Sequence, residues 1–359
     1  MKRKSVQNIC IILFLVLGAA VTQAGAAVIT VDANGGANYT SIQEAVDNAQ
    51  NGDTIIVNPG VYQENVRINK ELTITSNSNL TEDQFKRTYV LGAIPDNDVF
   101  SINSDNVTIE GLYISGGPSG TERSEVGIYL EGVKNCSLIN NALILNDMGI
   151  LLSGAQGNYL NSNLVSLGNN GISLVNSQEN ILSDNLVVTN SHGISLNNSI
   201  NNTVVNNTAG SNSIGIYLEM AGGNTLAYNV VSKNEYGIFG QTSQSNTLIN
   251  NSLSLNGIGV FFNESSNNAI YANEFINFLN AIDEGDNIWN SSSTGNYWSN
   301  YTGVDADGNG IGDTPYVVNT TTGSADYMPL MNITVSDNES EEQVETTTEE
   351  TTTEETTTE

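Results

Sequence analysis

Basic side chains are scarce in this chain of 359 residues. Lys and Arg together number 10, whereas Asp and Glu number 39, and the formal net charge is −29 at pH 7. A surface this acidic repels phosphate groups, so we expect neither nucleic acid nor an anionic membrane surface as a partner.

Long apolar runs are also missing, except for Ile9 to Val21 near the N-terminus. Basic residues at 2–4 precede this run and small residues at 24–26 follow it, which predicts a secretory signal peptide over 1–26. The run falls short of the ~20 residues that a membrane span needs. We therefore expect a secreted, extracellular or cell-surface protein with a mature charge of 7 − 39 = −32 and no membrane anchor after signal cleavage.

Cysteine and histidine are nearly absent. Cys10 falls within the signal segment, which leaves Cys136 alone and makes a disulfide framework impossible. His192 is the single histidine of the chain. An exported protein without disulfides must be stabilised by its backbone architecture.

What the chain does have is a strict repeat of 22 residues between Gly127 and Asn273. Each repeat begins with Gly, continues with Ile or Val, and has Leu, Val or Ile eleven positions after the Gly. Two columns of Asn also recur. One, nine positions after the Gly, begins at Asn158. The other, fourteen positions after the Gly, consists of Asn141, Asn163, Asn185, Asn207, Asn229, Asn251 and Asn273.

This period is too short for a propeller blade, and a leucine-rich repeat would need a helical segment that is not visible. The pattern predicts an all-β fold, a right-handed single-stranded parallel β-helix over 53–290 with regular coils over 127–280. Successive coils would stack about 4.8 Å apart. We expect the Asn columns to form ladders at bends, because Asn tolerates left-handed backbone angles and its amide both donates and accepts hydrogen bonds.

One short helix is predicted ahead of the coils, over 41–50 within an N-terminal cap at 27–52. Ser41 and Glu44 have the spacing of a capping box, and Asn51-Gly52 would end the helix. Such a helix is expected to cover the first coil, whose unpaired edge would otherwise invite aggregation.

Runs of residues at both ends of the chain carry a family resemblance. They are Ser41-Ile42-Gln43-Glu44-Ala45-Val46, Gly52-Asp53-Thr54-Ile55, Pro59-Gly60-Val61-Tyr62-Gln63-Glu64, Gly295 to Tyr301, Asp305 to Tyr316, and Asp326 to Leu330. These runs resemble carbohydrate-binding and sugar-hydrolase β-helices, and most closely the NosD-like proteins of archaeal surfaces. The resemblance covers roughly 40–331, with 291–331 as a C-terminal closing module. It implies the fold but not an activity, because the family mixes enzymes, binding proteins and other surface proteins.

The repeat register argues against a catalytic site on the regular coils, and no catalytic residue is predicted. Glu131 and Glu219 share an outward column four coils apart, about 19 Å at the strand spacing, whereas the carboxyl pair of a glycosidase lies about 5–9.5 Å apart. No Arg follows Arg123, so an Arg base on these coils is excluded. The enzyme alternative, a polysaccharide lyase or hydrolase, would act from the irregular stretches 77–97 and 116–125, which hold Lys86, Arg87 and Arg123.

The resemblance also suggests copper, through a role in maturing a copper enzyme. Exported copper sites need clustered His, Met or Cys side chains. His192 and Met148 share a column but lie two coils apart, about 10 Å, with Asn170 between them. We expect no copper site, and a copper-enzyme maturation factor is the disfavoured alternative.

A structural calcium site is predicted in the closing module. Asp305, Asp307, Asn309 and Asp313 place side-chain oxygens at positions 1, 3, 5 and 9 of an EF-hand-like loop, with the Ile311 carbonyl at position 7. Position 12 is Tyr316 instead of Glu, so Asp326 is the candidate that completes the metal shell. The alternative is an acidic, Gly-rich turn without a metal.

One outward column is aromatic. Tyr217, Phe239 and Phe261 stand two positions after Gly in three successive repeats. Rings repeating about 4.8 Å apart would form a flat strip for stacking sugars, and the acidic surroundings favour neutral ones. The alternative is that a loop or the closing module covers the column.

The remaining expectations concern the tail and glycosylation. Residues 332–359 are rich in Thr and Glu, which predicts a disordered tail. Candidate glycosylation sites in Asn-x-Ser/Thr sequons are Asn38, Asn79, Asn106, Asn263, Asn300 and Asn338.

Together these features predict a non-enzymatic surface β-helix that binds a polysaccharide or cell-surface glycan, or that joins other surface-layer proteins. The polysaccharide lyase or hydrolase remains open, as does a purely structural surface protein without a ligand.

Overall fold

The computed structural model describes residues 25–78, 87–94, 97–116 and 126–332. The predicted signal segment, except for 25–26, lies outside these residues, as does the predicted tail except for Asn332. Lys86, Arg123, Asn79 and Asn338 also lie outside them. Across the described ranges, no helix is long and apolar enough to cross a membrane.

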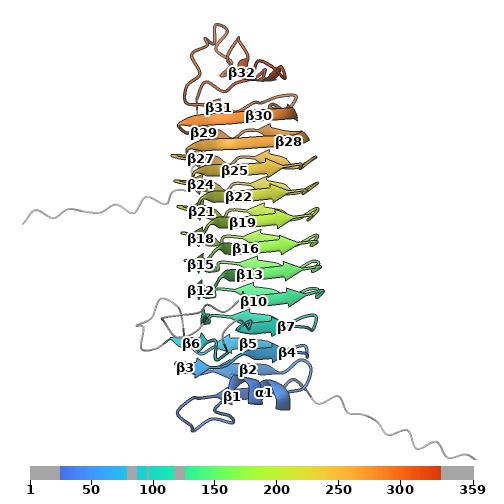
Figure 1. Cartoon of the computed structure of the whole chain (residues 1–359), viewed down its shortest axis with the longest axis vertical. Helices are drawn as coiled ribbons and strands as arrows, with labels where there is room; N and C mark the ends of the chain where they lie inside the picture. The colour runs from blue at the N-terminus through green and yellow to red at the C-terminus, as the bar shows by residue number, and fades with distance from the viewer. Residues whose placement is uncertain (1–24, 79–86, 95–96, 117–125, 333–359) are drawn as a thin grey trace, which may run out of the picture.

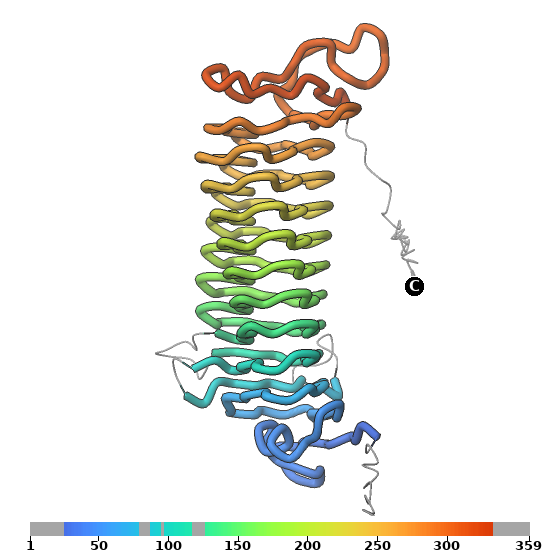
Figure 2. The backbone as a smooth tube through the Cα atoms, turned by 90° about the vertical axis from the view of Figure 1, so that its right-hand side faces the viewer, coloured from blue at the N-terminus to red at the C-terminus, as the bar shows by residue number. Residues whose placement is uncertain are grey.

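The chain winds into a tall column of parallel strands, with α1 (Ile42–Asn48) at one end and β32 at the other (Figure 1, Figure 2). Each regular coil contributes three strands, such as β10 (Val126–Glu131), β11 (Ser137–Ile139) and β12 (Ala142–Ile144). Corresponding strands pair in parallel at a shift of 22 residues, so that Ile128 lies opposite Ile150. The predicted all-β, right-handed parallel β-helix with 22-residue coils and a short capping helix is confirmed.

The strands form three faces along the column. Face 1 consists of β4 (Val66–Ile68), β7 (Phe100–Ile102), β10, β13 (Met148–Ser153), β16 (Asn170–Val175), β19 (His192–Asn197), β22 (Ile214–Glu219), β25 (Tyr236–Gln241), β28 (Ile258–Tyr271) and β30 (Leu279–Ile288). Face 2 consists of β1 (Val28–Val31), β2 (Thr54–Val57), β5 (Thr73–Ser76), β8 (Thr108–Glu110), β11, β14 (Tyr159–Asn161), β17 (Ile181–Ser183), β20 (Thr203–Val205), β23 (Thr225–Ala227) and β26 (Thr247–Ile249). Face 3 consists of β3 (Gly60–Gln63), β6 (Thr88–Leu91), β9 (Tyr113–Ser115), β12, β15 (Leu164–Ser166), β18 (Leu186–Val188), β21 (Thr208–Gly210), β24 (Val230–Ser232), β27 (Ser252–Ser254), β29 (Glu274–Ile276) and β31 (Tyr297–Trp298).

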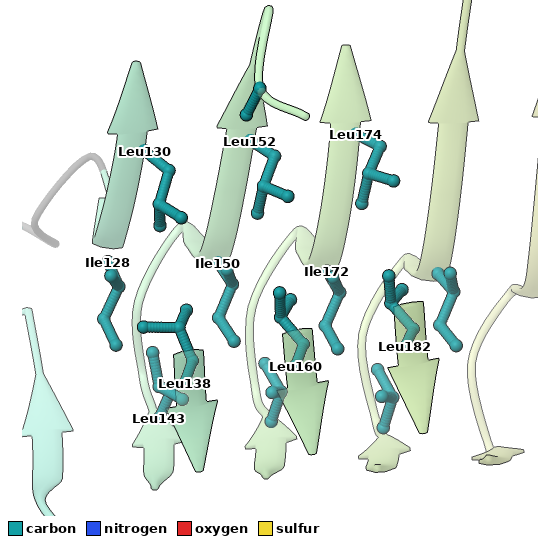
Figure 3. Packing of buried hydrophobic residues seen from close by; sticks show 14 of the residues in the cluster. Ile128, Leu130, Leu138, Leu143, Ile150, Leu152, Leu160, Ile172, Leu174 and Leu182 are labelled. Atoms are coloured by element: carbon teal, nitrogen blue, oxygen red, sulfur yellow. The ribbon is translucent and has the colours of Figure 1, made fainter. Parts of the chain in front are cut away.

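The bore of the column is filled by one apolar layer per coil. Ile128, Leu130, Leu138 and Leu143 come from the three strands of one coil, are fully buried, and lie beside their counterparts in the next coil (Figure 3). Removal of this apolar surface from water is the main force that holds the coils closed.

Glycine recurs at the start of face 1 because successive coils leave no room there for a side chain. A Cβ on Gly149 would lie 2.2 Å from Val165 Cγ1 and 2.6 Å from the Gly171 carbonyl oxygen. A Cβ on any other Gly of the column would likewise lie 2.4–2.6 Å from a backbone carbonyl oxygen of the next coil. The column is therefore set by a close approach of backbone to backbone.

Buried asparagine side chains join each coil to its neighbours. Asn185 donates from its backbone N–H to Asn207 Oδ1 (3.0 Å), and from Nδ2 to Asn207 Oδ1 (2.8 Å) and to the Leu160 carbonyl (3.0 Å). The same three bonds recur at every member of this ladder. A second ladder runs from Asn158 to Asn287, and a third, not anticipated from the sequence, joins Asn190, Asn212, Asn234, Asn256 and Asn277.

The left-handed backbone angle expected at the ladder Asn belongs to the residue before it. Asn206 and Tyr228 both have φ of 56°, whereas Asn207 and Asn229, which follow them, are not among the residues with positive φ. Asn is therefore held in the ladder by its amide, which satisfies backbone groups of adjacent coils that water does not reach.

The capping helix differs from the sequence prediction in its length and in its N-terminal partner. Ser41 Oγ accepts from the Glu44 N–H (3.2 Å), as a capping box requires. The reciprocal carboxylate is not that of Glu44, because Glu64 accepts from the N–H groups of Ile42 and Gln43 (2.9 Å each). A carboxylate from the following coil thus fastens the helix to the column.

Two buried tryptophans close the opposite end of the bore. Trp289 Nε1 donates to Asp283 Oδ2 (2.7 Å), and Trp298 Nε1 donates to Asp326 Oδ2 (2.9 Å). The antiparallel strands β32 (Tyr316–Asn319) and β33 (Ser324–Asp326) pack against β30. Burial raises the pKa of Asp326, and the N–H groups bonded to it oppose that shift.

The Asn ladder is expected to be sensitive to loss of a single amide. Asn207→Leu removes bonds to two coils, and each buried partner left unpaired costs about 1–3 kcal/mol of unfolding free energy. Asn197→Leu is the control, because this side chain faces outward from β19 and its bond to the partly exposed Glu219 carboxylate can be replaced by water, so we expect a cost below about 0.5 kcal/mol. Equal losses in denaturant unfolding would show that the ladder does not stabilise the coils.

The Gly column offers a second test. Gly149→Ala forces a methyl group against backbone and should lower the unfolding free energy by about 1–3 kcal/mol. Gly210→Ala is the matched control, because its nearest contact would be the Ser232 carbonyl oxygen at an ordinary 3.4 Å. The packing argument would be contradicted if both variants had the same melting temperature as the unmodified chain.

Candidate functional site

The three aromatic side chains expected on one outward column lie together on face 1. Tyr217 is opposite Phe239, and Phe239 is opposite Phe261, on β22, β25 and β28. Their ring centroids are 5.5 Å and 5.1 Å apart. All three rings are partly exposed. The closing hairpin β32–β33 packs against β30, beyond this column.

The rings do not form the flat strip that the sequence predicts. Phe239 and Phe261 are nearly parallel, at 11°, with centroids 5.1 Å apart. Carbon atoms of neighbouring rings stay about 3.5 Å apart, so rings at this centroid distance cannot lie side by side in one plane. They must overlap with a lateral offset, like roof tiles. Each ring therefore presents its edge and the margin of one face.

Two further rings extend the column, and the sequence analysis above did not assign them to it. Tyr236 lies 5.6 Å from Phe239 and 6.2 Å from Phe261, and His192 lies 5.4 Å from Tyr217, between ring centroids. Tyr236 and His192 both stand immediately before a repeat Gly, and that column also faces outward. We call these five residues the aromatic stack.

Burial disfavours a positive charge within the aromatic stack. The pKa of His192 is lowered by its partial burial, which favours the neutral imidazole. Burial also raises the pKa of the Tyr217 hydroxyl. The Glu219 carboxylate, which also contributes to the raised pKa of Tyr217, accepts a hydrogen bond from Asn197 Nδ2. The surroundings thus disfavour an anionic ligand and leave a neutral one unopposed.

The predicted calcium loop is organised by its own backbone. Asp305 accepts from the N–H groups of Gly308 and Gly310 (2.7 and 2.8 Å), and the Gly310 N–H is the main cause of its lowered pKa. Asn309 Oδ1 accepts from the Ile311 N–H (2.8 Å), and Asp313 Oδ2 accepts from the Ala306 N–H (2.8 Å). Asp307 accepts from the Asn309 N–H (3.1 Å).

Asp326 does not complete this loop, which corrects the ligand set inferred from the sequence. Its side chain is fully buried, and its oxygens accept from Asn296, Trp298 and Met328. Among the residues described, no group of three or more His, Cys, Asp or Glu side chains is placed to hold a metal ion. A calcium site at 305–313 therefore stays a prediction based on the sequence pattern.

The candidate glycosylation residues differ in exposure. Asn38, Asn106 and Asn300 are exposed. Asn263 is only partly exposed, and its Nδ2 donates to Gln241 Oε1 (2.8 Å). Its amide is thus the least available of the four.

This fold defines the class of the protein as a right-handed parallel β-helix. Solved structures that it resembles include tailspike protein 2 of bacteriophage CBA120 (TM-score 0.54, 13% identity, 77% of this chain and 47% of that chain). An alginate lyase from Paenibacillus sp. is also similar (TM-score 0.51, 12% identity, 73% of this chain and 97% of that chain), as is pectate lyase Pel9A (TM-score 0.51, 15% identity, 79% of this chain and 82% of that chain). At such low identities the likeness concerns the fold alone.

The family is identified by sequence. The profile described as "Periplasmic copper-binding protein (NosD)" matches residues 100–303, more than half of the chain, and the chain belongs to this family. A "Cell surface glycoprotein" of Methanothermus fervidus is 36% identical over 108 residues, which are 29% of this chain. The match spans only 16% of that relative's length.

The side chains described here do not fit copper, despite the family's description. His192 Nδ1 is hydrogen-bonded to Asn170 Oδ1 (3.1 Å), and Met148 lies two coils away in the register. The Cys136 thiol is buried, and burial raises its pKa to about 11, so it stays protonated near neutral pH. Copper sites in exported proteins need such groups to converge on one point, and these three do not.

The calcium prediction is testable by metal removal. If residues 305–313 bind calcium, a chelator should lower the melting temperature and excess calcium should restore it. At a hundredfold excess over Kd, calcium would raise the free energy of unfolding by about 2.7 kcal/mol. Asp307→Ala should abolish the response, and Asp286→Ala, an exposed acid outside the loop, should preserve it. Melting of the unmodified chain that ignores the chelator would rule the site out.

Proposed function

We propose that this protein is a secreted or cell-surface β-helix that binds a neutral glycan without cleaving it, through the aromatic stack on face 1. The observation that carries the proposal is a run of partly exposed rings, repeated at the spacing of the coils on a rigid sheet. A surface that is ordered before binding loses little conformational entropy when a ligand docks.

The tiled arrangement modifies how a sugar would bind. Ring edges and face margins give a ridged apolar strip, on which the C–H groups of a sugar would pack between successive rings. Aromatic side chains supply large apolar contact area, and this part of the energy does not depend on ligand charge. A neutral sugar avoids repulsion from Glu219 and from a chain whose net charge is −29.

The comparisons support a surface location and contact with glycans in general terms. The archaeal relative is described as a cell surface glycoprotein, and two proteins of similar fold are described as lyases for alginate and pectate. Face 1 supports binding in preference to catalysis, because Glu131 on β10 and Glu219 on β22 are separated by three intervening strands. We further propose that the protein takes part in a surface layer together with other proteins, which the description of the archaeal relative favours.

Removing one ring tests the proposed function. Phe239→Ala deletes the centre of the aromatic stack and should weaken retention on neutral glycan columns about tenfold, the equivalent of ~1.4 kcal/mol. Phe278→Ala is the matched control, because this ring is 97% exposed and lies outside the stack. Melting temperature and circular dichroism of both variants should stay close to those of the unmodified chain.

Two results would contradict the proposal. Unchanged retention of Phe239→Ala together with a large fall in melting temperature would show that the rings serve packing. Release of reducing ends or unsaturated uronates from any polysaccharide in a set of acidic and neutral ones would show that the protein is a lyase or hydrolase.

A further inference from the structure

A concave site lies on face 1 near its N-terminal end. It is a groove of about 450 Å³, which we call the N-terminal groove. Its lining comes from β4, β7, β10 and the residues that flank them: Arg67, Asn69, Asp98, Ser101, Asn103, Tyr129 and Glu131.

The groove is built on the same outward column as the aromatic stack. Arg67 is opposite Ser101, and Ser101 is opposite Tyr129. A second row, formed by Asn69, Asn103 and Glu131, stands one residue beyond the paired Ile68, Ile102 and Leu130. Two adjacent rows of polar side chains therefore project from three successive coils.

Four of these side chains have polar groups without a partner among the residues that the structure describes. The side chains of Arg67, Asn69, Asn103 and Glu131 make no hydrogen bond or ion pair with any residue in the described part of the chain. Ser101 Oγ donates to Asp98 Oδ2 (3.1 Å). The Asn ladders differ in this respect, because amides inside the column pair with one another, whereas the amides of Asn69 and Asn103 bond to no residue within the described ranges.

The composition of the groove matches a hydroxyl-rich ligand. A guanidinium and two amides donate to hydroxyl oxygens, the Glu131 carboxylate accepts from hydroxyl groups, and the Tyr129 ring adds apolar surface. Few convergent polar groups around an aromatic side chain are typical of small-molecule sites. With two carboxylates against one guanidinium, an acidic polymer would be repelled on balance.

The same residues are poorly placed for glycoside cleavage. Asp98 lies opposite Val126 in the extended register, and Glu131 lies five residues further along β10. Five strand residues span roughly 16 Å between Cα atoms, which exceeds the separation of about 5–9.5 Å that a carboxyl pair needs. The two carboxylates therefore do not form the acid–base pair of a glycoside hydrolase.

We propose that the N-terminal groove is a second binding site for a neutral oligosaccharide, and that it continues the aromatic stack as one track along the column. Tyr129 and Tyr217 are four coils apart on the shared column, about 19 Å. Between them stand Leu151, Ser173 and Ser195. The two serines are small and nearly buried, 7% and 8% exposed, so they would form the floor of the track and the rings at its two ends would make the contacts. The proposal for the groove depends only on the residues that line it, whereas the continuous track rests on the function proposed above.

The test is a binding series with short and long neutral glycans. Gluco-, manno- and galacto-hexaoses serve as short probes, their neutral polymers as long probes, and polygalacturonate as the acidic probe. Arg67→Ala and Asn103→Ala should each weaken binding of one neutral hexaose about tenfold. Lys233→Asn, a cation removed from outside the groove at a left-handed position that Asn tolerates, should not change it.

The outcomes separate this site from the aromatic stack. If Arg67→Ala weakens hexaose binding while Phe239→Ala weakens only the long polymers, both the groove and the track are supported. Hexaose affinity unchanged in Arg67→Ala and Asn103→Ala, both folded by melting temperature, overturns the groove even if Phe239→Ala abolishes polymer binding. Tighter binding of polygalacturonate than of any neutral probe overturns the ligand class, and product release that depends on Glu131 overturns a purely binding role.

Discussion

The hydrogen bond from one asparagine amide to the next coil is the interaction that sets the register of the column. It requires the same residue at the same place in each turn, because Asn207 Oδ1 accepts both the backbone N–H and the Nδ2 group of Asn185. An insertion of one residue would turn the amide away from its neighbours and leave buried backbone groups unpaired. This explains why the regular part of the chain keeps its period of 22 without interruption.

The fixed register of the Asn ladders also aligns the side chains on the outer surface of the column. Outward side chains are held in straight rows one coil apart, so a row with similar residues becomes an extended surface, as in the aromatic stack. Where the outward residues differ between coils, as at Arg67, Ser101 and Tyr129, the same geometry creates a groove with mixed chemistry. The fold thus supplies a scaffold on which the exposed residues can vary without a change in the coils.

Part of the aromatic stack could be predicted from the sequence, whereas Tyr236 and the N-terminal groove could not. The column of Tyr217, Phe239 and Phe261 follows from the period alone. Tyr236 was missed because the residue before Gly was not assigned to the outward face. The groove was missed because 34 residues separate Arg67 from Ser101 and 28 separate Ser101 from Tyr129, so the period of 22 does not align them.

The amino-acid sequence alone determined the fold class, the coil length and the ladder positions, because a hydrogen-bonded ladder and a filled bore both require strict repetition. It also determined the acidic surface and the scarcity of soft metal ligands. Only the tertiary structure decided that the rings overlap as tiles, since the spacing of coils is too short for rings to lie flat beside one another. It likewise decided that Asp326 is buried against Trp298, because the closing end needs an acceptor for a buried indole N–H.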